Sequence, residues 1–125
     1  MGPVLIDSSV IVGVLRNHGN ALALAELVKG VPKAVPDEVI GEVLAGARNK
    51  REFGFILTHL RDNFIWLSGN EQVSTVFRSL LIRYGPHHGV HMVDYRIAAT
   101  AIVHELPLLT LNKKHVQFIE GLRLA

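Results

Sequence analysis

Short apolar runs alternate with longer segments of helical periodicity along this chain, and no other feature constrains its fold as strongly. The runs are rich in Val, Ile and Leu and are only a few residues long, like strands buried on both faces of a sheet. This alternation is typical of a parallel sheet covered by helices. The sequence therefore predicts an α/β fold with strands at residues 3–6, 33–35, 64–67 and 107–111 and a last β-like segment at 122–124.

Apolar residues at helical spacing fill the intervals between these strands. We expect Asp37 to cap the helix after the second strand, a polar turn at 85–89 to follow the longest helix, and Trp66 to lie in the core. The predicted helices cover residues 8–15, 20–28, 37–47, 53–60, 71–84 and 92–104.

The length and composition limit the class of protein. A chain of 125 residues has room for one hydrophobic core, so we expect a single domain over residues 1–125. A hydrophobic content of 49% excludes intrinsic disorder, and the lack of cysteine excludes disulfides and thiolate metal sites. No apolar run approaches the length of a bilayer span, and the first residues lack the pattern of a signal peptide. We therefore expect a cytoplasmic protein without a membrane partner.

Three carboxylates and one amide stand out against the apolar pattern. Asp7 follows the first strand directly, at the end where open parallel sheets bind their ligands, although it also suits a helix N-cap. Asn112 follows the fourth strand at the same edge, where an ordinary turn or cap also explains it. Glu42 and Asp94 occur on predicted helices, and Asp94 is near enough to a helix start to be a cap. Their neighbours at helical spacing are Val39, Ala45 and Gly46 around Glu42, and Ile97, Ala98 and Ala101 around Asp94.

Acids that face inward need a cation, because burying an unpaired carboxylate is strongly unfavourable. Oxygen ligands without sulfur favour Mg²⁺ or Mn²⁺. Such an ion activates water and neutralises phosphate oxygens, so no side-chain nucleophile is required. The sequence accordingly contains neither a G-x-S-x-G elbow nor a glycine-rich phosphate loop. These residues therefore indicate metal-ion catalysis on phosphates.

Four short motifs in this order resemble the PIN-domain ribonucleases of the VapC toxin type. They are Asp7-Ser8-Ser9-Val10 after an apolar strand, Glu42-x-x-x-Gly46, the run from Asp94 to Ala101, and Leu108-Leu109-Thr110-Leu111-Asn112. The segment from His115 to Leu124 is also similar to the ending of that family.

The resemblance implies a three-layer α/β/α sandwich with a parallel sheet of about five strands. It implies an endoribonuclease that uses Mg²⁺, with Mn²⁺ as an alternative, a cognate antitoxin as partner, and a homodimer. By the same resemblance Asp7, Glu42 and Asp94 are the catalytic metal ligands, and Ser9 supports Asp7. The family often has aspartate at or just after the position of Asn112, so we expect this neutral amide to be a supporting ligand or to orient water, at a second metal site that is weak or water-mediated.

Other residues have open interpretations. A net charge of +2 does not by itself indicate a nucleic-acid partner, but Lys113, Lys114 and Arg48 are candidate contacts for RNA phosphates or simply solvated side chains. The histidines of His87-His88-x-x-His91 are predicted to lie in a polar loop that binds metal only adventitiously. A non-catalytic PIN-like binding module is the main alternative function. A phosphoacceptor receiver domain is disfavoured, because Ser68 and Gly69, not an aspartate, follow the third strand.

Overall fold

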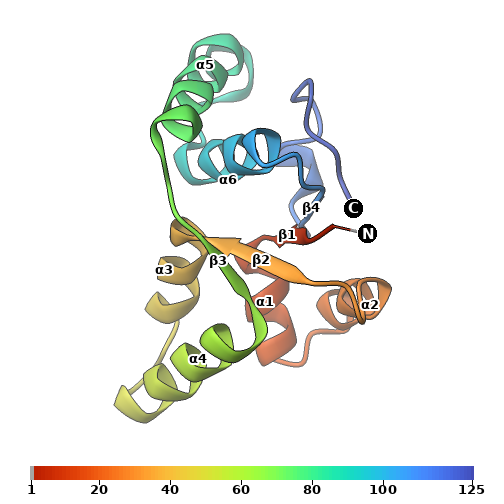
Figure 1. Ribbon diagram of the computed structural model, residues 1–125, viewed down its shortest axis with the longest axis vertical. Helices are drawn as coiled ribbons and strands as arrows, with labels where there is room; N and C mark the ends of the chain where they lie inside the picture. The colour runs from red at the N-terminus through yellow and green to blue at the C-terminus, as the bar shows by residue number, and fades with distance from the viewer. Residues whose placement is uncertain (1) are drawn as a thin grey trace.

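A parallel four-stranded sheet forms the centre of the molecule. The computed structural model describes residues 2–125. The strands lie in the order β3-β2-β1-β4, and each neighbouring pair is parallel (Figure 1). Their bounds are Val4–Ile6 for β1, Lys33–Pro36 for β2, Ile65–Leu67 for β3 and Leu108–Leu109 for β4.

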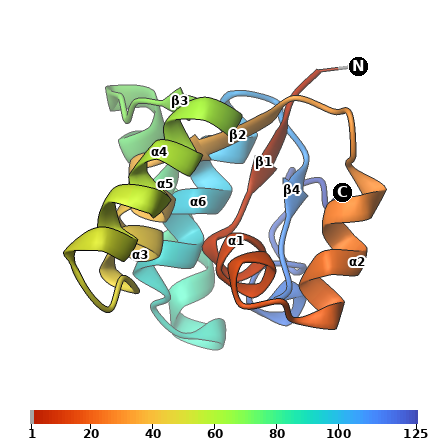
Figure 2. The ribbon, with the colours of Figure 1, turned by 90° about the horizontal axis from the view of Figure 1, so that it is seen from below.

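Helices cover both faces of this sheet and make three layers. Figure 1 shows α5 and α6 on one face and α1 to α4 on the other, and Figure 2 shows α1 between α2 on one side and α3 and α4 on the other. The helices are α1 (Ser8–Leu15), α2 (Gly19–Leu27), α3 (Asp37–Ala45), α4 (Lys50–Asn63), α5 (Glu71–His88) and α6 (Met92–Val103), and a short 3₁₀ helix, η1, covers Lys113–His115. The predicted three-layer α/β/α architecture is therefore confirmed.

The order of the strands explains where polar residues gather. The chain crosses from β1 to β2 to β3 in one direction and returns to β4 on the far side of β1, so β1 and β4 are adjacent. Leu5 and Ile6 pair with Leu108 and Leu109 in parallel register. Since all strands point the same way, the residues that follow β1 and β4 meet at one edge of the sheet.

The prediction of about five strands is wrong, because the structure has four. The last β-like segment forms only an isolated parallel bridge between Leu108 and Leu124. The Leu108 N–H donates to the Arg123 carbonyl at 2.9 Å, and the Ala125 N–H donates to the Leu108 carbonyl at 2.8 Å. Since β4 has only two residues, it offers too few backbone groups for a longer ladder with this segment.

The long helix α5 continues to His88, beyond the predicted end at residue 84 and through Pro86. Proline lacks an N–H and costs one helical hydrogen bond, but contacts with distant residues hold this last turn. The Tyr84 hydroxyl accepts from the Glu120 N–H at 2.9 Å, and the Tyr95 hydroxyl donates to the Gly89 carbonyl at 2.6 Å. The helix ends at Gly89, whose φ of 88° suits glycine.

Two local predictions also differ from the structure. Trp66 is 41% exposed, because β3 is an edge strand, and its indole N–H donates to the Leu60 carbonyl at 3.0 Å. Asp37 is the first residue of α3 and Pro36 occupies the cap position, with no side-chain cap bond. Within residues 2–125, none of the helices combines the length and the apolar character that crossing a bilayer requires.

Candidate active site

Asp7 is buried at the carboxyl end of β1, where three donors hold its carboxylate. The residue as a whole is only 5% exposed. Oδ1 accepts from the Ser8 N–H at 2.8 Å, while Oδ2 accepts from the hydroxyls of Ser9 and Thr110, both at 2.7 Å. Asp7 is thus both the N-cap of α1 and an anchored acid at the sheet edge. Since all three donors are neutral, they fix the carboxylate without neutralising its charge.

Thr110 connects the ends of β1 and β4, and the sequence analysis did not identify it as a site residue. Its hydroxyl also accepts from the Asn112 N–H at 3.0 Å, and the Leu111 N–H donates to Ser9 Oγ at 3.2 Å. The signal available in the sequence was a hydroxyl directly after the apolar strand, at the same edge as Asp7. Asn112 therefore joins this network through its backbone.

Glu42 lies on α3, and its carboxylate accepts from the Ser8 hydroxyl at 2.9 Å. The prediction that it faces inward is wrong, because residue 42 is exposed at the surface of α3. Partial desolvation nevertheless raises the pKa of Glu42, and the negative charges of Asp7, Asp94 and Glu38 raise it further, against the bond from Ser8. Glu42 therefore lies within electrostatic range of the other three carboxylates.

Asp94 lies in the first turn of α6, and its side chain is 25% exposed. Its Oδ2 is 3.3 Å from Nδ1 of His115. The helix begins at Met92 with His91 in the cap position, so Asp94 is not the cap that the sequence also allowed. Its carboxylate instead faces the segment after β4.

The three predicted ligands share one region but do not form a compact cluster. Over residues 2–125, no group of three or more histidine, aspartate and glutamate side chains has the spacing of a metal site. Like charge from Asp7, Asp94 and Glu38 opposes a closer approach of Glu42. The donors available are oxygens on a rigidly held aspartate and two helices, which is the ligand chemistry that Mg²⁺ and Mn²⁺ accept. The donor set therefore fits such an ion.

The predicted phosphate contacts separate into two groups. Lys113 and Lys114 are exposed on η1, directly after the strand-end network. Arg48 instead forms an ion pair with Glu52, in which Nε at 3.1 Å and Nη2 at 2.9 Å both donate to Oε2. Arg48 thus belongs to a different region of the molecule.

Three histidines and Phe118 form two stacked pairs. His87 and His88 end α5 instead of lying in a loop, and the His88 ring stacks on Phe118 with centroids 3.7 Å apart. His91 stacks on His115 with centroids 5.4 Å apart. These packing contacts explain the positions of His88, His91 and His115.

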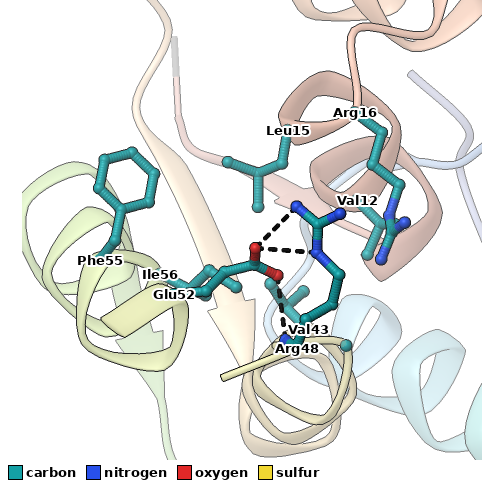
Figure 3. A pocket seen from close by; sticks show the side chains of 9 residues that line it. Val12, Leu15, Arg16, Val43, Arg48, Glu52, Phe55 and Ile56 are labelled. Atoms are coloured by element: carbon teal, nitrogen blue, oxygen red, sulfur yellow. Dashed lines mark hydrogen bonds and ion pairs between the residues drawn. The ribbon is translucent and has the colours of Figure 1, made fainter. Parts of the chain in front are cut away.

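A cavity of about 370 Å³ lies between α1, α3 and α4, and the sequence analysis did not predict it. Figure 3 shows Arg48 paired with Glu52 among the apolar side chains that line the cavity. The lining consists of Val12, Leu15, Arg16, Val43, Gly46, Arg48, Glu52, Phe55 and Ile56. We call this region the α1–α3–α4 pocket.

Comparisons with known proteins agree with this architecture. The family model described as PIN domain matches residues 4–119. The chain is 34% identical over 125 residues to Ribonuclease VapC19 of Mycobacterium tuberculosis, covering 95% of this chain and 96% of that protein. Two solved structures share the fold. VapBC2 from Rickettsia felis bound to a promoter DNA fragment has a TM-score of 0.83 at 19% identity, covering 98% of this chain and 97% of that chain. VapBC-1 from nontypeable Haemophilus influenzae has a TM-score of 0.84 at 20% identity, covering 98% of this chain and 96% of that chain.

Proposed function

The chain belongs to the PIN domain family, and from this premise we propose that it is a metal-dependent endoribonuclease, the toxin of a type II toxin–antitoxin pair. The observation that carries the proposal is the strand-end network. Asp7 is buried there and held by Ser9 and Thr110, and its carboxylate and that of Asp94 lie within electrostatic range of Glu42. Nothing in the network neutralises the charge of Asp7, which is the arrangement a divalent cation requires.

Asp7, Glu42 and Asp94 would hold Mg²⁺, or Mn²⁺ as the alternative. When bound, such an ion lowers the pKa of its water and neutralises a phosphate oxygen, which is the chemistry of phosphodiester hydrolysis. The protein contributes orientation. Ser9 from the first turn of α1 and Thr110 from the residue after β4 fix Asp7, and Ser8 from the start of α1 fixes Glu42. These bonds orient two of the three carboxylates before substrate arrives.

Partners follow from the same premise. A toxin–antitoxin complex from Klebsiella pneumoniae shares this fold, with a TM-score of 0.79 at 21% identity, and this supports a cognate antitoxin for this chain. We assign RNA as the substrate and propose a homodimer built from one domain per chain, over residues 1–125. We propose that Lys113 and Lys114 contact RNA phosphates beside the cleaved bond; their exposed position directly after the Thr110 network supports this.

RNA cleavage by the purified protein tests the proposal. We expect cleavage with Mg²⁺ or Mn²⁺, no cleavage after EDTA treatment, and a loss of activity in Asp94→Asn. The control Asp62→Asn makes the same chemical change on the exposed face of α4 and should keep full activity.

The alternative is a non-catalytic binding module, favoured by the neutral Asn112 and by the lack of a compact group of three ligands among residues 2–125. Cleavage that survives EDTA would contradict metal dependence. A protein that binds RNA but does not cleave it with either ion would establish the alternative instead.

A further inference from the structure

The two helices that carry Glu42 and Asp94 are joined by an ion pair outside the set of proposed ligands. Nε of Arg96, on α6, donates to Oε1 of Glu38, on α3, at 2.8 Å. Glu38 precedes Glu42 by one helical turn, and Arg96 follows Asp94 by two residues. This Arg96–Glu38 pair is therefore a direct polar link between the segments that present two of the three carboxylates.

The Arg96–Glu38 pair is better shielded than the other ion pairs between lysine or arginine and an acid in residues 2–125. Its side chains are 32% and 19% exposed, whereas those of Arg83 and Glu120 are 58% and 76% exposed. Shielding matters because an exposed ion pair contributes little to holding two helices together. A partly buried pair contributes more, since removing either partner leaves an uncompensated charge.

Contacts from two more elements hold the Arg96 guanidinium. Its Cζ lies 5.4 Å from the ring centroid of Phe77, on α5, in a cation–π arrangement. A Cβ at Gly69, between β3 and α5, would lie 3.4 Å from Nη2 of Arg96, so this loop passes close to the guanidinium. Arg96 is thus in contact with α3, α5 and the loop, which leaves its side chain little freedom.

Glu38 would otherwise add a fourth free carboxylate beside the proposed ligands. It lies one turn before Glu42 on α3, and residues four apart on a helix are neighbours on its surface. The bond from Arg96 occupies Oε1 of Glu38 and neutralises its charge.

We propose that Arg96 is a positioning residue: by binding Glu38 it fixes α3 against α6, sets Glu42 relative to Asp94, and keeps Glu38 away from the bound ion. This inference rests on the proposed function. It assigns no contact with substrate to Arg96, whose effect passes through the two ligand-bearing helices.

Calorimetric binding of Mn²⁺ to the full-length protein, combined with RNA cleavage, tests this role. Arg96→Met should weaken Mn²⁺ binding and lower cleavage by about 10-fold each, the size of effect typical of residues that orient metal ligands. Glu38→Gln keeps an oxygen acceptor for Nε and should stay within about twofold of the wild type. Glu38→Leu removes the acceptor, so its losses of Mn²⁺ binding and cleavage should match those of Arg96→Met. The double variant, Arg96→Met with Glu38→Leu, should lose no more binding or cleavage than either single variant, because the two residues act as one unit.

Arg83→Met is the matched control, because Arg83 also pairs with a glutamate, Glu120, and lies over an aromatic ring, Tyr84, at 5.2 Å. It should leave Mn²⁺ binding unchanged. If Arg96→Met does not fold, Arg96→Lys replaces it; this variant keeps the charge but lacks the planar guanidinium and should show an intermediate loss.

The outcomes separate this inference from the function on which it rests. A wild-type protein that binds Mn²⁺ and cleaves RNA, with Arg96→Met or Arg96→Lys equal to it in both, overturns the positioning role alone. Glu38→Gln as impaired as Glu38→Leu overturns it too, since charge and not geometry would then matter. A wild-type protein with neither activity overturns the proposed function and this inference together.

Discussion

The strand-end site and the α1–α3–α4 pocket both hold a carboxylate, but they satisfy it in opposite ways. At the strand ends, Asp7 is buried and accepts hydrogen bonds only from neutral donors, two of them the hydroxyls of Ser9 and Thr110. In the pocket, Glu52 is paired with the guanidinium of Arg48 (Figure 3). Neutral donors fix a carboxylate and preserve its charge, whereas an arginine cancels it. Only the first arrangement attracts a cation.

The pKa shifts of two glutamates follow the same division. Partial burial and the charges of Asp7, Asp94 and Glu38 raise the pKa of Glu42, although Ser8 opposes this. Hydrogen bonds from Arg48 lower the pKa of Glu52. The two directions agree with negative charge that gathers at the strand ends and is compensated in the pocket, and this supports the proposal that the active site lies in the first region.

The largest expected difference between the two regions is in RNA cleavage. Asp7→Asn keeps the size of the side chain but removes the charge, and it should lower cleavage by at least about 100-fold, more than the loss typical of a residue that only orients a ligand. Glu52→Gln makes the corresponding change in the pocket and should stay within about twofold, as surface substitutions usually do. Initial rates of cleavage at saturating Mg²⁺ measure both. Equal losses in the two variants would remove the distinction between the regions.

Removing a hydroxyl from the strand-end network should destabilise the fold. Thr110→Val leaves Oδ2 of buried Asp7 with one donor fewer, and the free energy of unfolding should fall by about 1–3 kcal/mol. Thr75→Val is the matched control, because the Thr75 hydroxyl bonds only the Glu71 carbonyl of its own helix at an exposed position. Its effect should stay within about 0.5 kcal/mol. Urea denaturation of both variants distinguishes a buried network from a general cost of losing threonine.

The fold class was predictable from the sequence, whereas most contacts of the site were not. Periodicity is a local property, so it predicted the alternation of strands and helices and placed Asp7 at a strand end. The bond from Thr110 to Asp7 joins residues 103 positions apart, and that from Arg96 to Glu38 joins residues 58 apart. No local pattern contains these pairs.

Local patterns also failed where tertiary contacts decide the outcome. Pro86 predicted a break, yet contacts of Tyr84 and Tyr95 extend α5 to His88. Trp66 read as core, but the strand order puts β3 at the edge of the sheet. Small neighbours suggested that Glu42 faces inward, but the structure exposes it beside Ser8. Whether Asp7, Glu42 and Asp94 bind one ion stays a prediction.

The pH dependence of stability should have opposite signs for the two glutamates. The pKa of Glu42 is raised from its ordinary value of 4.5, so the folded state binds the proton more tightly than the unfolded state does. Its ionised form therefore destabilises the fold once the pH rises above that range. In metal-free protein, Glu42→Gln should raise the free energy of unfolding at pH 7, by less than about 1 kcal/mol because the residue is exposed, and this gain should vanish in acid.

The smallest expected effect is that of the Arg48–Glu52 pair on stability. The lowered pKa of Glu52 means that its contribution is present above the ordinary value of 4.5 and is lost as the pH falls below it. Glu52→Gln should therefore lower Tm at pH 7 only slightly, less than Thr110→Val does, and the decrease should shrink further in high salt. Thermal unfolding at two pH values and two salt concentrations measures this. A large, salt-independent decrease would mean that the pocket pair is as important to the fold as the strand-end network.

The most direct test of the central claim, that Asp7 and Asp94 bind one divalent ion together, is a calorimetric titration of Mn²⁺ into metal-free protein. The wild type should show saturable binding, and Asp7→Asn and Asp94→Asn should each weaken it by at least about 10-fold. Asp62→Asn should bind like the wild type. No saturable heat in the wild type, or binding by Asp94→Asn equal to that of the wild type, would contradict a shared metal site at the strand ends.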